Sequence, residues 1–131
     1  MVNRREMRRF LLPLAALGIS AAAVATPAIL PGVAPGLWEV SRSATGRAPV
    51  RLCLPDLAAM AQWEHRGGAC TRVVLSQTAR EAVIHYTCPA GDFGRSRMTV
   101  VTPRSLRMET QGIHGGEPFS YKLYARRAGN C

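Results

Sequence analysis

The chain has 131 residues, with 17 Lys and Arg against eight Asp and Glu, and a net charge of +9 with neutral histidines. This length suits one small domain and is too short for several. Because the chain has no basic run of five residues and no aromatic-rich RNA-binding motif, its positive charge does not indicate a nucleic-acid partner.

The first 25 residues have the composition of a secretory signal peptide. Two arginine pairs within Arg4–Arg9 precede an apolar run from Phe10 to Ala25, which closes on Ala23-Val24-Ala25, a sequence typical of signal-peptidase cleavage. The run has 16 residues, fewer than the roughly 20 that a transmembrane helix needs. We therefore expect residues 1–25 to be removed, no transmembrane anchor to remain, and the protein to be periplasmic or secreted.

The rest of the chain is divided into a leader and one domain. Residues 26–35 contain three prolines and no periodic pattern, so we expect an extended leader before a single domain at 36–131. Short segments rich in strand formers follow, separated by turn residues. They are 37–41, 50–54, 71–76, 82–88, 96–102, 105–110 and 119–127. The last alternates apolar with polar residues, as in a half-buried antiparallel strand.

Residues 55–63 differ from the strand segments because they are rich in Ala, Met and Leu. Pro55 suits the first turn of a helix, and the pattern ends at Gly67-Gly68. The apolar residues at helical spacing are Leu57, Met60 and Ala61. The segments together predict a mainly β domain with one short α-helix. Its six or seven antiparallel strands form either a curved meander that closes towards a barrel or a sandwich.

Four cysteines lie in the predicted mature chain: Cys53, Cys70, Cys88 and Cys131. An even number in a small exported domain predicts two disulfides, and the wide spacing is unlike the close pairs of a four-cysteine zinc site. If 71–76 and 82–88 form a hairpin, Cys70 and Cys88 lie opposite each other, and Cys53 then pairs with Cys131. The two other pairings stay open.

Several segments resemble a known family. They are Pro35–Val40, Cys53–Asp56, Cys70, Cys88 and Ala125–Cys131. Together they resemble the exported bacterial family catalogued as domain of unknown function 3617 (DUF3617). The family tends to have Thr-Pro-Glu-Asp after the first Cys-Leu, whereas this chain has only Pro55-Asp56. The resemblance implies a small secreted, mainly β protein with four cysteines, and it implies no activity and no functional residues.

The sequence shows no motif of a known catalytic or metal site, such as G-x-S-x-G, a Walker loop or H-E-x-x-H. We therefore predict no catalytic residue, no cofactor and no metal. His85 lies within a strand segment and is expected to be structural. His65 lies beside Glu64, which leaves a metal or acid–base role open there, and a hydrolase that uses His65 or His85 is the most distant hypothesis. His114 lies in a glycine-rich stretch that predicts a turn.

Trp38 and Trp63 are expected in the core, and the alternative is that they line a ligand cavity of a curved β domain. The leading hypothesis is a non-enzymatic exported protein that binds a small apolar ligand or an anionic cell-envelope component. The alternative is an interaction or inhibitor module that acts on an envelope protein. The oligomeric state stays open.

Overall fold

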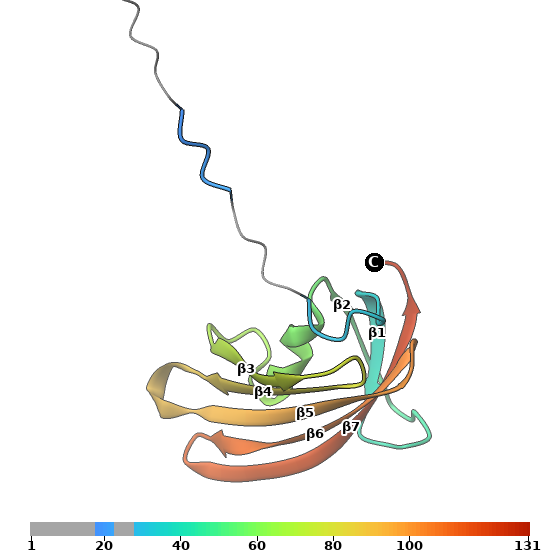
Figure 1. Cartoon of the computed structure of the whole chain (residues 1–131). Coiled ribbons are helices and arrows are strands. Elements are labelled where there is room, and N and C mark those ends of the chain that lie inside the picture. Colours follow the sequence, from blue (N-terminus) through green and yellow to red (C-terminus); the bar gives the residue numbers. More distant parts are fainter. Residues whose placement is uncertain (1–17, 23–27) are drawn as a thin grey trace, which may run out of the picture.

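The computed structural model describes residues 18–22 and 28–131, and all regular elements lie in the second range. One open, curved sheet contains seven antiparallel strands in the order β2-β1-β7-β6-β5-β4-β3 (Figure 1). The strands are β1 (Gly36–Ser41), β2 (Val50–Leu54), β3 (Thr71–Gln77), β4 (Glu81–Thr87), β5 (Phe93–Thr102), β6 (Ser105–His114) and β7 (Glu117–Gly129). The predicted mainly β class is confirmed, as a curved sheet rather than a sandwich.

The strand order places the single long helix across the hollow of the sheet. Strands β3 to β7 form a meander of neighbours in sequence, and β1 adds to the free side of β7 with β2 outside it. The helix η1 (Leu57–His65) joins β2 to β3, which are the two edge strands. The helix therefore has to cross the concave face, where it contacts β2, β4, β5 and β6.

The helix is wound as a 3₁₀-helix, not as the α-helix that the sequence predicts. A 3₁₀-helix has three residues per turn, so residues three apart lie in one row. Leu57 and Met60 have this spacing and are buried, and Trp63 is buried just beyond Gln62, where the backbone leaves the helical conformation with φ −97° and ψ 37°. Asp56 caps the helix by accepting a hydrogen bond from the backbone N–H of Ala58 at 2.9 Å.

The core lies between η1 and the inner face of the sheet. It is formed by large side chains that alternate with exposed residues along the strands, among them Trp38, Ile84, Met98, Met108 and Leu123. Three residues from the expected leader, Ile29, Leu30 and Val33, are buried in the same core. The described part of the leader, from residue 28, therefore contributes packing to the domain.

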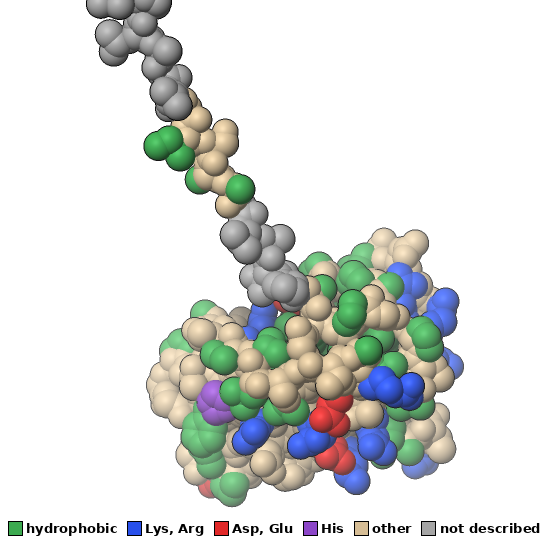
Figure 2. All heavy atoms as spheres, viewed as in Figure 1, with side chains coloured by type: hydrophobic (Ala, Val, Ile, Leu, Met, Phe, Trp, Pro, Cys, Tyr) green, Lys and Arg blue, Asp and Glu red, His purple; other side chains and the backbone are tan. Residues whose placement is uncertain are grey.

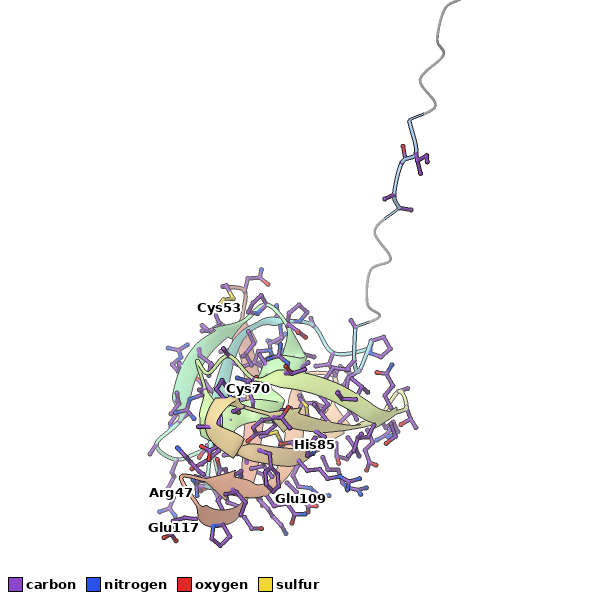
Figure 3. All side chains as sticks on the ribbon, turned by 90° about the vertical axis from the view of Figure 1, so that its left-hand side faces the viewer. Arg47, Cys53, Cys70, His85, Glu109 and Glu117 are labelled. Carbon is purple, nitrogen blue, oxygen red and sulfur yellow. A yellow bond between two sulfur atoms is a disulfide. The ribbon has the colours of Figure 1, made fainter. Side chains whose placement is uncertain are left out.

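Both disulfides have the predicted pairing. Cys70 and Cys88 flank the β3–β4 hairpin, where Thr71 pairs with Thr87, and their Cα atoms are 4.1 Å apart. Cys53 in β2 is bonded to Cys131 at the C-terminus, with a Cα separation of 5.5 Å. Figure 3 shows Cys53 near the top of the domain and Cys70 lower down, so the two bonds connect different parts of it. Two disulfides fit an oxidising, non-cytoplasmic compartment.

The predicted signal peptide lies mostly outside the described residues, so its cleavage stays a prediction. Within the described ranges, no helix has the length and apolar character needed to cross a membrane.

Candidate functional site

The densest group of polar side chains lies at one end of the sheet. The carboxyl ends of β4 and β6 meet the amino ends of β5 and β7 there, because neighbouring strands are antiparallel. The last residues of η1 reach the same end. We call this group the His65 cluster, and its members are Glu64, His65, Tyr86, Asp92, His114 and Tyr121.

His65 has a largely buried side chain, which is only 7% exposed. Its Nε2 lies 3.2 Å from Oδ2 of Asp92, which directly precedes β5. Its Nδ1 lies 3.0 Å from the hydroxyl of Tyr86 in β4. Both ring nitrogens therefore have a polar partner, and the position of the ring is fixed from two sides.

His114 reaches the cluster from the last position of β6. Its Nδ1 lies 3.0 Å from Oε1 of Glu64, and its ring centroid is 4.5 Å from that of His65. The other oxygen of Glu64 accepts a hydrogen bond from the hydroxyl of Tyr121 in β7. The side chain of His114 is 51% exposed, so this part of the cluster faces solvent.

Two glycines form the turn beside His114. Gly115 and Gly116 have φ values of +57° and +82°, which side chains rarely adopt, and they connect β6 to β7 as a two-residue hairpin turn. The predicted glycine-rich turn is therefore present. The N–H of Gly115 donates to Oδ1 of Asp92 at 3.0 Å, so the turn also positions the carboxylate that contacts His65.

The surroundings shift the pKa values of three members of the cluster. Burial, together with the negative charges of Glu64 and Asp92, raises the pKa of Tyr86 to about 12. Burial and the hydrogen bond to Glu64 raise the pKa of Tyr121 as well. Burial also raises the pKa of Glu64, but hydrogen bonds from Tyr121 and His114 outweigh it, and the net pKa lies below the ordinary value. At neutral pH, both tyrosines are therefore protonated and Glu64 is ionised.

The cluster offers ligands for a cation rather than a nucleophile for covalent catalysis. His65, Asp92 and His114 each present one nitrogen or oxygen atom, and these atoms lie within 4.8 Å of one another. The ring nitrogens of His65 contact Tyr86 and Asp92, not a serine or threonine hydroxyl. All four cysteines are in disulfides, so none supplies a thiolate. A hydrolase that uses His65 stays a hypothesis that these contacts do not test.

A second polar region covers the outer face of the sheet, which points away from η1. Its cationic residues are Arg51, Arg95, Arg97, Arg107, Lys122 and Arg126, and its carboxylates are Glu39, Glu81 and Glu109. These residues lie opposite one another across neighbouring strands. Figure 2 shows Lys and Arg side chains over the lower and right-hand part of the visible face, with acidic side chains among those at the lower centre.

Ion pairs neutralise only part of the outer face. Arg97 lies 2.9 Å from Glu81, and Arg126 lies 2.8 Å from Glu39. Within residues 28–131, Arg95 has no carboxylate partner, and the same holds for Arg107. A shallow groove of about 720 Å³ runs over β5 to β7. Its polar lining includes Arg95, Arg97, Gln111, Ser120 and Lys122.

The two tryptophans are core residues. Trp38 is fully buried in β1, and Trp63 is 6% exposed at the end of η1. Trp63 also borders a cleft of about 380 Å³, together with Arg42, Arg66 and Glu64. The guanidinium carbon of Arg66 lies 4.0 Å from the Trp63 ring centroid. Charged groups therefore cover the side of Trp63 that a small apolar ligand would need.

The remaining candidate residues lie elsewhere. His85 is in β4 on the outer face, opposite Arg95, and is not part of the His65 cluster. The edge strand β3 exposes three consecutive apolar residues, Val73, Val74 and Leu75. A register shift between Val74 and Ser76 interrupts its pairing with β4.

The sequence singled out only His65 of the cluster. Asp92, Tyr86 and Tyr121 were not expected to join it, because they come from three separate strands or loops. One signal was present, since His65 and His114 both lie within two residues of a glycine, where the sequence predicts the chain to turn.

The chain belongs to the DUF3617 family, because the family model described as "Protein of unknown function (DUF3617)" matches residues 33–131. The resemblance in the residue pattern is therefore confirmed. No curated protein and no solved structure matches the chain.

Proposed function

We propose that this member of the DUF3617 family is an exported, non-enzymatic protein that binds the anionic surface of an envelope membrane through the outer face of its sheet. The observation that carries the proposal is the excess of cationic over acidic residues on that face, with Arg95 and Arg107 unpaired within residues 28–131. The signal-peptide sequence and the two disulfides support export.

The physical basis is charge complementarity. Each Lys or Arg close to an anionic bilayer contributes about 1 kcal/mol to binding, and salt screens this attraction. The side chains of Arg126 and Lys122 are 74% and 61% exposed, so they reach solvent without rearrangement. The outer-face groove is bordered by Arg95, Arg97 and Lys122 and by one carboxylate, Glu109, so cationic residues outnumber the acidic one where a phosphate head group would bind. A small apolar ligand is less well supported, because both tryptophans are packed in the core.

Co-sedimentation with lipid vesicles tests the proposal on the oxidised, exported protein. We expect binding to vesicles that contain phosphatidylglycerol and none to vesicles of phosphatidylcholine alone. The double variant Arg95→Gln/Arg107→Gln should weaken binding by roughly 30-fold, the equivalent of about 2 kcal/mol. The control Arg47→Gln/Arg80→Gln removes the same charge from two exposed loop positions and should bind nearly as well as wild type. An equal loss of vesicle binding in both double variants would show that binding depends on net charge and not on the outer face. Equal binding to both vesicle types would refute the proposal.

The edge strand β3 favours a second candidate function, an interaction module for another envelope protein. Val73, Val74 and Leu75 are 53%, 42% and 49% exposed, and the outer side of an edge strand has unpaired backbone groups. An extended segment of a partner protein can add to such an edge as a further strand.

A single substitution separates this function from membrane binding. Val73→Lys places a charge on the edge and should remove a stoichiometric crosslinked partner, while vesicle binding persists. Val101→Lys in β5 is the matched control, because Val101 is an equally exposed strand valine at 59%. The interaction hypothesis fails if the crosslinked partner persists in Val73→Lys or disappears in both variants.

A further inference from the structure

We propose that the His65 cluster binds one divalent transition-metal ion of the zinc type, with Nε2 of His65, Oδ2 of Asp92 and Nε2 of His114 as ligands. The outer face plays no part in this site, so the inference does not depend on membrane binding. Two imidazole nitrogens and one carboxylate oxygen suit Zn²⁺, whereas Mg²⁺ and Ca²⁺ prefer sites made of oxygen atoms.

The spacing of the ligand atoms fits this ion. Bonds of about 2.0–2.2 Å in a tetrahedral zinc site place neighbouring ligand atoms roughly 3.3 Å apart. His65 Nε2 and Asp92 Oδ2 already have this spacing, at 3.2 Å. One nitrogen or oxygen atom from each of His65, Asp92 and His114 lies within 4.8 Å of the other two, so metal binding requires only that these side chains approach one another further. The side chain of His114 is half-exposed at the end of β6.

Each ligand also has a second partner that fixes its orientation, as metal-binding side chains usually do. Nδ1 of His114 faces Glu64, whose ionised carboxylate accepts the N–H and leaves Nε2 free for the metal. Nδ1 of His65 faces the hydroxyl of Tyr86. The backbone N–H of Gly115 holds Oδ1 of Asp92 and leaves Oδ2 for the ion.

The hydroxyl of Tyr86 can either donate a hydrogen bond to Nδ1 of His65 or accept one from it, so this contact can persist when a metal binds Nε2. Nδ1 of His65 lies 3.0 Å from this hydroxyl, and Nε2 lies 3.2 Å from Oδ2 of Asp92. A neutral imidazole that binds a metal through Nε2 carries its proton on Nδ1, and the hydroxyl oxygen of Tyr86 is placed to accept a hydrogen bond from that Nδ1–H. Three protein ligands leave one position of a tetrahedral ion open to water.

Calorimetric titration of the chelator-treated, oxidised protein tests the site. We expect one equivalent of Zn²⁺ to bind and Mg²⁺ not to bind. His114→Ala and Asp92→Asn should each weaken zinc affinity about 100-fold or more, since even the loss of an outer partner weakens metal binding 10- to 100-fold. Asp92→Asn keeps an oxygen for the N–H of Gly115, so the turn is preserved. His85→Ala is the control, because it removes a histidine of β4 that lies outside the cluster.

Two further measurements distinguish the loss of a metal ligand from misfolding of the variant. Near-ultraviolet circular dichroism should be unchanged in His114→Ala, because that side chain is half-exposed. Co²⁺, added in place of Zn²⁺, should give the visible absorption of a tetrahedral site in wild type and in His85→Ala, but not in His114→Ala. The proposal is overturned if wild type binds no stoichiometric zinc, or if folded His114→Ala and Asp92→Asn bind zinc as tightly as wild type.

Discussion

The His65 cluster and the outer face are two polar regions of one sheet, and they differ in how their side chains are held. In the cluster, short and rigid side chains contact one another through hydrogen bonds, and His65 is 7% exposed. On the outer face, long side chains extend into solvent, and Arg126 is 74% exposed. A region of the first kind can select an ion by geometry, whereas a region of the second kind attracts any anionic surface and is screened by salt.

The difference arises from the position of each region on the sheet. The outer face is formed along the strands, where every second residue points away from η1. The cluster is formed at the strand ends, where β4, β5, β6 and β7 meet the last residues of η1. Changes to the loops and glycines of that end should therefore affect the cluster and leave the outer face intact.

The largest effect is expected from the disulfides. In the chain-entropy model, a bond across 18 residues stabilises by about 3 kcal/mol and one across 78 residues by about 4.5 kcal/mol. Cys88 begins the loop that carries Asp92, and its N–H donates to the carbonyl of Asp92 at 2.8 Å. The variant Cys70→Ser/Cys88→Ser should therefore lose about 3 kcal/mol of unfolding free energy in urea, and its folded form should also bind zinc more weakly.

The second disulfide supplies the control for this prediction. Cys53→Ser/Cys131→Ser should be the less stable of the two double variants, yet its folded form should bind zinc as wild type does, because this bond lies beyond the carboxyl end of β7, whereas the cluster lies towards the amino end of that strand. Vesicle binding should persist in both variants while they are folded. Equal zinc affinities in the two double variants would contradict the link between the β3–β4 disulfide and Asp92.

A smaller effect is expected from Gly94→Ala in β5. A Cβ atom at Gly94 would collide with the ring of Tyr86, the residue that orients His65. Overpacking of this kind destabilises by about 1–3 kcal/mol, and displacement of the Tyr86 hydroxyl should also weaken zinc binding. Thr99→Ala, on the outer face of the same strand, should change the unfolding free energy by less than about 0.5 kcal/mol. Urea unfolding and zinc titration of both variants check the prediction, which fails if Gly94→Ala behaves like Thr99→Ala.

Much of the fold could be predicted because its signals are local. Strand-forming residues separated by turn residues predicted all seven strands, and the hairpin that brings Cys70 and Cys88 together followed from the two segments between them. The winding of η1 could not be predicted in the same way. Leu57 and Met60 are three residues apart, a spacing that fits an α-helix as well as a 3₁₀-helix, and the irregular backbone at Gln62 has no sequence signal.

The His65 cluster was harder to predict from the sequence, because it depends on the lengths of the strands and on the register in which they pair. His114 joins His65 only because β6 is long enough to end beside η1, and the sequence predicted that strand to end at Thr110. Asp92 follows a short turn that carried no motif. A hydrogen-bonded cluster built from five separate elements has no fixed spacing in sequence, so its members appeared as scattered single residues.

The smallest effect on the unfolding free energy is expected from Glu64→Gln. Its dependence on pH distinguishes the hydrogen-bonded His65 cluster from the solvent-exposed outer face. The folded-state pKa of Glu64 lies below its ordinary value of 4.5, because hydrogen bonds from Tyr121 and His114 outweigh the effect of burial. A lowered pKa means that Glu64 adds stability above pH 4.5 and that this contribution is lost as the pH falls through the folded-state pKa. Chelator-treated wild type should therefore be more stable than Glu64→Gln at neutral pH, and urea unfolding at a series of pH values should show the difference shrinking in acid. Glu117→Gln, an exposed residue of β7, is the charge-matched control. A stability difference that stays constant across the acid range would show that Glu64 acts through packing rather than through its charge.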